Sequence, residues 1–236
     1  MTTNPIETLD TSWKGLYRWG GISAMLAGVI LFVVLASALV LGAPTSNTGE
    51  GILKWLGGGT TLAYSFYGLS MVVDVLLVPV VLAVYLALKG VNKNAMLTAA
   101  GFWGLALALD LGVTCITWIA LITLSQNYAA ATSDVQRAAF VATADYAVGI
   151  TSVSATVYGS IVYMIGPLVT SLVMLKGVFS KVTAYVGLVG GIVGLAYGVT
   201  VFVPYSSFVL IPLAISFILL GIWLLLAGSR LYSLGK

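Results

Sequence analysis

Long apolar segments separated by short polar ones follow one another from residue 19 to residue 228. An α-helix needs roughly 20 apolar residues to cross the hydrocarbon core of a bilayer, and these segments are of that length. The pattern predicts an all-α fold, a polytopic transmembrane helical bundle with six spans, which forms a single domain over residues 1–236. The six predicted spans are about residues 20–42, 60–88, 95–125, 148–176, 182–203 and 207–228.

A polar run separates the third and fourth predicted spans. Within it, Ser133-Asp134-Val135-Gln136 has the spacing of a capping box, in which Ser133 and Gln136 would each satisfy a backbone N–H of the other. We therefore predict a short amphipathic segment outside the membrane at residues 133–146, with a helix that begins at this box and runs towards the fourth span. Asp145, at the outer end of that span, is interpreted as a solvated residue at a helix end.

Composition agrees with the apolar pattern and excludes several classes of protein. Apolar residues make up 60% of the chain and charged residues 7%, so lipid must cover most of the folded surface. The net charge of +3 is too small and too dispersed for nucleic-acid binding. The sequence has no histidine and one cysteine, Cys115, which is interpreted as a small apolar filler. Histidine-ligated haem, zinc or copper and histidine acid–base catalysis are thereby excluded.

No nucleophile–base constellation and no glycine-rich phosphate loop occurs in the sequence. We therefore expect no enzymatic activity and no cofactor, and the lipid bilayer is the expected partner.

The basic residues predict the orientation of the bundle. With six spans, one side receives eight of the ten Lys and Arg residues and the other side receives only Lys54 and Arg137. Because Lys and Arg gather on the cytoplasmic side of membrane proteins, both termini should be cytoplasmic. The expected location is a cytoplasmic (plasma) membrane.

Small residues recur every fourth position in two predicted spans. They are Gly20, Ala24 and Gly28 in the first span and Gly190, Gly194 and Gly198 in the fifth. This spacing lets two helix backbones approach closely in lipid. The interpretation favoured is a packing seam inside one bundle; an interface in a homo-oligomer or a larger membrane complex is the alternative.

Two carboxylic acids, Asp74 and Asp110, fall inside predicted spans. Asp74 lies 15 residues before Lys89, and Asp110 lies 16 residues after Asn94, on either side of one short loop. At 1.5 Å per residue, both acids lie about 22–24 Å along their helices from that loop. Since the loop is short, the second and third spans should be antiparallel neighbours, with the two acids at matching depth.

Polar residues on the neighbouring faces extend this pair into a candidate cation or proton site. Tyr67 and Ser70 share a helical stripe with Asp74, and the fourth span contributes Ser160 and Tyr163 among many hydroxyl residues. Pro79 and Pro167 each leave a carbonyl without its helical N–H donor near the same depth. The candidate site is Asp74, Asp110, Tyr67, Ser70, Ser160 and Tyr163, and which metal it would take, if any, is unknown.

No Lys, Arg or His lies within the spans to neutralise these acids. They can be protonated, bind a cation from solution, or accept several hydrogen bonds, and only the first two imply a function. A protonated Asp that bonds across a helix interface contributes roughly 0.6–2 kcal/mol as polar glue, which is the structural alternative. The function predicted is a carrier or channel for a small solute or cation. The alternative is a non-catalytic scaffold or an accessory subunit of a larger membrane complex.

A resemblance rests on the run Asp74 to Lys93, the following run Ala95 to Leu124, the glycine-rich fifth span, and the end of the chain from Ile215 to Leu231. With these features the chain resembles an uncharacterised family of small six-helix integral membrane proteins of prokaryotes. The resemblance implies a six-helix membrane bundle and supplies no substrate, reaction or site residue.

Overall fold

The computed structural model describes residues 11–42, 44, 46–156, 162–198 and 210–236, and every regular element within these ranges is helical. The α-helices are α1 (Lys14–Leu41), α2 (Gly49–Gly58), α3 (Thr60–Leu88), α4 (Lys93–Leu109), α5 (Ile116–Ala130), α6 (Asp134–Thr156), α7 (Tyr163–Met174), α8 (Lys181–Gly198) and α9 (Leu210–Leu234). A 3₁₀-helix, η1 (Thr11–Trp13), precedes α1, and a π-helix, η2 (Asp110–Cys115), joins α4 to α5. The all-α prediction is confirmed.

Five helical segments are long and apolar enough to cross a membrane by length and composition. They are α1, α3, α8, most of α9, and the continuous 38-residue segment Lys93–Ala130 formed by α4, η2 and α5. At 1.5 Å per residue that segment is about 57 Å long, well beyond the roughly 30 Å of a hydrocarbon core. The predicted range 60–88 coincides with α3, whereas the predicted end at residue 125 falls five residues before the end of α5.

The fourth predicted span, 148–176, differs most from the structure. Its first part belongs to α6 and its second part to α7, while residues 157–161 lie outside the described residues. The segment predicted as short and amphipathic, 133–146, is the first half of the 23-residue helix α6. Apolar α7 has only 12 residues, about 18 Å, too few to cross a bilayer alone. A crossing here therefore needs both helices.

The capping box at the start of α6 forms in part. Gln136 N donates to Ser133 Oγ at 3.3 Å, as predicted. The Gln136 side chain, however, accepts from Thr132 N at 3.1 Å rather than from Ser133 N. The Gln136 side chain therefore binds the backbone N–H of Thr132, one residue before the predicted capping box.

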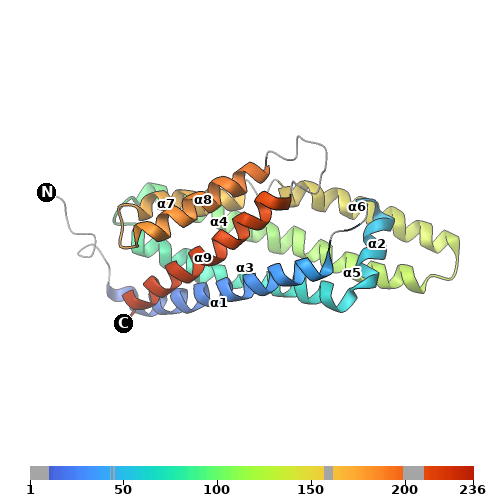
Figure 1. Ribbon diagram of the computed structural model, residues 1–236, viewed down its shortest axis with the longest axis horizontal. Coiled ribbons are helices and arrows are strands. Elements are labelled where there is room, and N and C mark those ends of the chain that lie inside the picture. The colour runs from blue at the N-terminus through green and yellow to red at the C-terminus, as the bar shows by residue number, and fades with distance from the viewer. Residues whose placement is uncertain (1–10, 43, 45, 157–161, 199–209) are drawn as a thin grey trace.

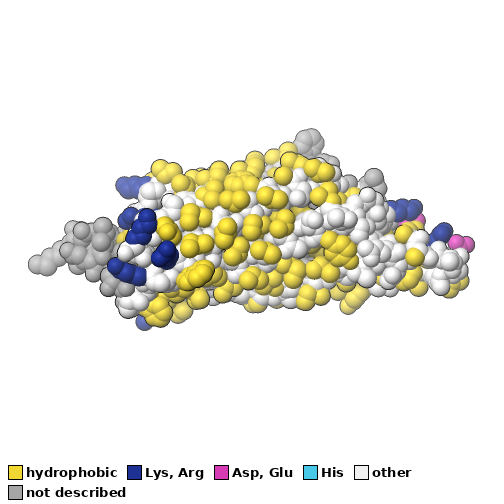
Figure 2. Space-filling model, turned by 90° about the horizontal axis from the view of Figure 1, so that it is seen from below, with side chains coloured by type: hydrophobic (Ala, Val, Ile, Leu, Met, Phe, Trp, Pro, Cys, Tyr) yellow, Lys and Arg dark blue, Asp and Glu magenta, His cyan; other side chains and the backbone are white. Residues whose placement is uncertain are grey.

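The surface of the bundle is apolar between two charged ends. In Figure 1, α1 begins and α9 ends at the same end of the molecule, and Figure 2 shows Lys and Arg gathered there, with apolar side chains over the middle. We call this end the basic end. Large apolar side chains point outward along the helices, such as Val29, Val75, Leu97 and Ile192, each 55–60% exposed. Water would disfavour such a surface, and lipid would not.

The small residues that were predicted to form packing seams pack against other helices of the same chain. A Cβ at Gly20 would meet Ala83 and the Pro79 carbonyl of α3, and one at Gly28 would meet Gly221 and Leu225 of α9. In α8, Gly190 faces Leu219 of α9, and Gly194 faces Met164 of α7 and Ser216 of α9. These glycines therefore form seams within one bundle, as favoured from the sequence.

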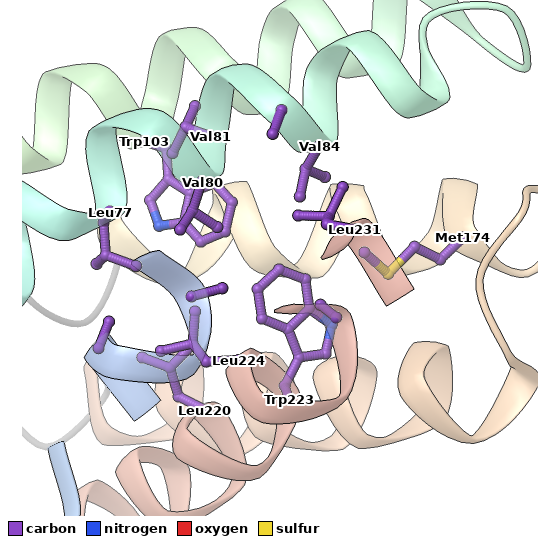
Figure 3. Close-up of a cluster of buried hydrophobic side chains, with 14 of the residues drawn as sticks. Leu77, Val80, Val81, Val84, Trp103, Met174, Leu220, Trp223, Leu224 and Leu231 are labelled. Atoms are coloured by element: carbon purple, nitrogen blue, oxygen red, sulfur yellow. The ribbon is translucent and has the colours of Figure 1, made fainter. Parts of the chain in front are cut away.

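Two separate clusters of buried apolar side chains form the core of the described residues. The first contains Leu77, Val80, Trp103, Trp223 and Leu224, with the two indole rings 5.7 Å apart between centroids (Figure 3). We call it the inner cluster, because it lies towards the basic end. The second, the outer cluster, lies at the opposite end and joins α2, α3, α5 and α6 through the side chains Ile52, Leu53, Leu56, Ala63, Tyr67, Leu121, Ile122 and Ala144.

Helix α2 contributes to the outer cluster although the sequence analysis did not predict it. Ile52, Leu53 and Leu56 of α2 are at most 3% exposed. Its N-terminus is capped twice, since Thr48 Oγ1 accepts from Gly51 N and Asp145 Oδ1 accepts from Gly49 N. Asp145 is exposed, but it lies in the middle of α6 and not at a helix end as predicted, and its carboxylate binds the N-terminus of α2.

Candidate intramembrane cation site

The two acids predicted at matching depth lie together. Asp74 comes from the middle of α3 and is 4% exposed, while Asp110 is the first residue of η2 and is partly buried. A carboxylate oxygen from each and the Cys115 Sγ all lie within 4.8 Å of one another. The loop of residues 89–92 therefore places α3 and α4 as the antiparallel neighbours that the sequence predicted.

The π-helix brings Cys115 into this group. In an α-helix, residues five apart point about 140° away from each other, because each residue turns the chain by about 100°. A π-helix pairs residue i with residue i+5, which brings Asp110 and Cys115 to the same side. Local π segments occur frequently at functional sites. The sequence analysis interpreted Cys115 as a small apolar filler. Cys115 is indeed buried, at 3% exposure, but its thiol lies beside the two acids and not among apolar side chains alone.

The two predicted tyrosines are both buried. Tyr163, 7% exposed, interacts electrostatically with both carboxyl groups. Tyr67, 8% exposed, stacks on Trp118 with 4.9 Å between ring centroids and lies in electrostatic range of Cys115. Of the two, Tyr163 contributes an apolar wall and a hydroxyl to the surroundings of the carboxyl groups.

Two hydroxyl groups near the pair in sequence are engaged with their own helices. Ser70 Oγ donates to Phe66 O at 2.8 Å, and Thr117 Oγ1 donates to Val113 O at 2.7 Å. Both hydroxyl groups thus donate their protons within their own helices. Ser70 can therefore act at the site only as a hydrogen-bond acceptor or cation ligand through its lone pairs. Ser160 lies outside the described residues.

Both prolines lie inside helices, Pro79 in α3 and Pro167 in α7. Neither can donate to the carbonyl four residues earlier, which belongs to Val75 and Tyr163 respectively. Both unpaired carbonyls therefore belong to residues at or next to the candidate site.

The acid pair lies at the boundary between the inner and outer clusters. On α3, Tyr67 belongs to the outer cluster and Val73 and Leu77 to the inner cluster, so Asp74 lies at the edge of the inner cluster. Along the neighbouring helix, Leu107 belongs to the inner cluster and Leu121 to the outer one, with η2 between them. The acids thus form a polar layer with apolar packing on both sides.

Two buried oxygen atoms of this layer have no hydrogen-bond partner among the described residues. Asp74 Oδ2 is fully buried and accepts no hydrogen bond from the described residues, and Thr114 Oγ1 on η2 is buried without a partner in the same part of the chain. No Lys or Arg occurs in the sequence between residues 55 and 88 or between residues 94 and 136. A charged carboxylate without partner or counter-ion is costly at this depth, so a proton or a bound cation has to balance it.

The buried polar layer, the apolar exterior and the long apolar helices define a multi-pass helical membrane protein. The chain belongs to the family described as domain of unknown function DUF4386, which matches residues 22–228 and so covers all five long helices at least in part. The resemblance to an uncharacterised membrane family is thereby confirmed. Neither a curated protein nor a solved structure matches the chain.

Proposed function

We propose that this protein is a carrier or channel for a small cation, which binds at Asp74 and Asp110 in the polar layer between the two apolar clusters. Tyr67, Ser70, Ser160 and Tyr163 are the proposed surrounding polar residues. One observation carries the proposal: two acids from adjacent helices lie together in lipid-exposed helices with no basic residue to balance them.

The two apolar clusters support the proposal because each can act as a gate. A cation that reaches the acids from the basic end must pass the inner cluster with Trp103 and Trp223. From the opposite end it must pass the outer cluster, where Tyr67 stacks on Trp118. Apolar constrictions block ions by excluding water, and a carrier opens one at a time around a fixed site.

We further propose six membrane crossings, with α6 and α7 together forming the fourth, and the basic end on the cytoplasmic side of a prokaryotic plasma membrane. Both ends of the described chain lie at the basic end, where Gly235 approaches Lys14 and Arg18. Reporter fusions at the C-terminus and at Thr132 should read out opposite sides of the membrane. Reporters on the same side would contradict this topology.

The test of function uses the purified full chain in sealed vesicles loaded with cation-sensitive dyes. Flux of monovalent and divalent cations is measured for the parent and for Asp74→Asn and Asp110→Asn, which keep size and remove charge. Asp134→Asn, an exposed acid in the first turn of α6, is the matched control. We expect a cation-dependent flux that both site variants abolish and the control retains.

Correct folding of the variants is checked by size-exclusion chromatography and circular dichroism. A parent with no flux of any cation tested, or site variants that transport like the parent, would overturn the proposal. If the Asn variants alter only the stability of the bundle, the acids act as polar glue, and the alternative function of scaffold or accessory subunit is favoured.

A further inference from the structure

The donor set of the site is mixed, with two carboxylates and one thiol. Hard cations such as Mg²⁺ and Ca²⁺ prefer oxygen ligands, whereas thiolate selects softer or borderline cations such as Zn²⁺. Cys115 is 3% exposed, and its sulfur lies within 4.8 Å of an oxygen of each acid. A site for Na⁺, K⁺ or Mg²⁺ gains nothing from such a neighbour.

Asp74 supplies an independent observation that points to a ligand for this group. It is 4% exposed, and its Oδ2 accepts no hydrogen bond from the described residues. Buried polar atoms are nearly always satisfied, so an orphaned carboxylate oxygen in a buried cluster requires an explanation. A cation bound by the Asp74 carboxylate would satisfy it, as would a proton shared between the two acids.

The dimensions of the group fit a tetrahedral ion after small side-chain movements. With metal–oxygen bonds of about 2.0 Å and a metal–sulfur bond of about 2.3 Å, neighbouring ligand atoms in a tetrahedron are about 3.3–3.5 Å apart. The three donor atoms, which lie within 4.8 Å of one another, therefore need to approach by at most roughly 1.5 Å. Rotation about the side-chain bonds of Asp110 and Cys115 accomplishes this, and a fourth position stays open for water.

We propose that Asp74, Asp110 and Cys115 form a binding site for a thiophilic divalent cation of the Zn²⁺ class. This inference rests on the proposed function, since the same acids bind the cation, and it adds the chemical class of that cation. Three protein ligands with one open position are typical of sites that exchange a ligand, whereas structural zinc sites have four.

The sequence makes the spectroscopic test unusually clean. Co²⁺ bound to a thiolate gives a charge-transfer absorption in the near ultraviolet, and oxygen ligands alone do not. Because the chain has one cysteine and no histidine, such a band can arise only from Cys115. We expect the purified full chain to show this band on titration with Co²⁺, and Zn²⁺ to displace it while Mg²⁺ and Ca²⁺ do not.

Affinity measurements on variants identify the other ligands. Loss of an outer-shell partner of a metal ligand already lowers affinity 10–100-fold, so loss of a direct ligand should cost at least about 100-fold. Cys115→Ser, Asp74→Asn and Asp110→Asn should each weaken Zn²⁺ binding by this factor in equilibrium dialysis. Asp134→Asn should leave the affinity unchanged.

A Co²⁺ complex without the thiolate band, or Zn²⁺ affinity that is equal in the parent and in Cys115→Ser, would overturn the inference. The first measurement uses the parent alone and decides even if a variant fails to fold. If another cation is transported in a manner that requires Asp74 and Asp110, and Zn²⁺ does not bind, this inference is refuted and the proposed function is kept. If Zn²⁺ binds through Cys115 but no cation is transported, the proposed function is refuted and the zinc site is kept.

Discussion

Replacing Gly21 by alanine should force α1 and α9 apart. A Cβ at this position would lie 2.5 Å from Tyr232 N, 2.7 Å from Gly228 O and 2.9 Å from Tyr232 Cα, all backbone atoms of α9. Ordinary van der Waals contacts of a Cβ lie at 3.4–4 Å. Because helix backbone cannot turn aside as a side chain does, the two helices must separate locally by roughly 1 Å.

The energetic cost follows from this separation. A radial gap of about 0.5–1 Å forfeits a quarter to a half of each dispersion contact, and overpacking of a filled core typically costs about 1–3 kcal/mol. Alanine gains at most about 1 kcal/mol over glycine in helix propensity. The net expectation for Gly21→Ala is a loss of up to about 2 kcal/mol in the free energy of unfolding relative to the parent, and of about 1–3 kcal/mol relative to an alanine that gains the same propensity without the clash.

Reversible unfolding by sodium dodecyl sulfate in mixed micelles, followed by circular dichroism and tryptophan fluorescence, measures this difference. Gly101→Ala is the matched control, since Gly101 is an exposed residue inside α4 whose Cβ would meet nothing within 4 Å. The control should be as stable as the parent or up to about 1 kcal/mol more stable. If Gly21→Ala is as stable as Gly101→Ala, the close approach of α1 and α9 is refuted.

Two further predictions concern the end of the bundle opposite the basic end. Asp145→Ala removes the acceptor for Gly49 N, so α2 should lose about 0.5–2 kcal/mol of local stability, measured as faster amide hydrogen exchange in α2, while Asp134→Ala leaves that exchange unchanged. Hydrogen bonds from Lys54 and Tyr128 lower the pKa of Glu50, so a small stabilisation is present above the ordinary Glu pKa and is lost as pH falls through the lowered value. Glu50→Gln should remove that pH dependence from the unfolding midpoint, and an identical pH profile in parent and variant would contradict the assignment.

The helices that the sequence predicted well are those whose boundaries carry a polar signal. Residues 60–88 were predicted as a span and form α3, because the polar stretch from Lys89 to Asn94 ends one helix and Asn92 caps the next. The juxtaposition of Asp74 and Asp110 follows from the same loop, since equal distances from a short connection give equal depth in two antiparallel helices.

Helix α2 was missed because local propensity argues against it. Four of its ten residues are glycines, each costing about 1 kcal/mol relative to alanine inside a helix. What stabilises it lies elsewhere in the chain: the Asp145 carboxylate at its N-terminus and the outer cluster around Ile52 and Leu53. Tertiary contacts of this kind are invisible to a pattern along the sequence.

The π-helix was missed for a different reason. Periodicity reveals a helix register only when one face is polar, and the segment from Lys93 to Ala130 is apolar on most sides. With α-helical geometry, Asp110 shares its stripe with Thr114 and Thr117. The change from α-helix to π-helix over the six residues Asp110–Cys115 instead brings Cys115 beside the acids. One local irregularity in the backbone thus changes the donor set from oxygen alone to oxygen and sulfur.

The division of the core favours a working site over simple polar glue. A single hydrogen-bonded acid that fastens two helices can lie anywhere along a continuous apolar interface. Here the acids lie near the boundary of two apolar clusters, beside a π-helix and the buried Tyr163, and Asp74 Oδ2 has no donor among the described residues. Glue would be stronger with that oxygen satisfied and the clusters joined. An arrangement that gives up both is better explained by a ligand that enters, binds and leaves.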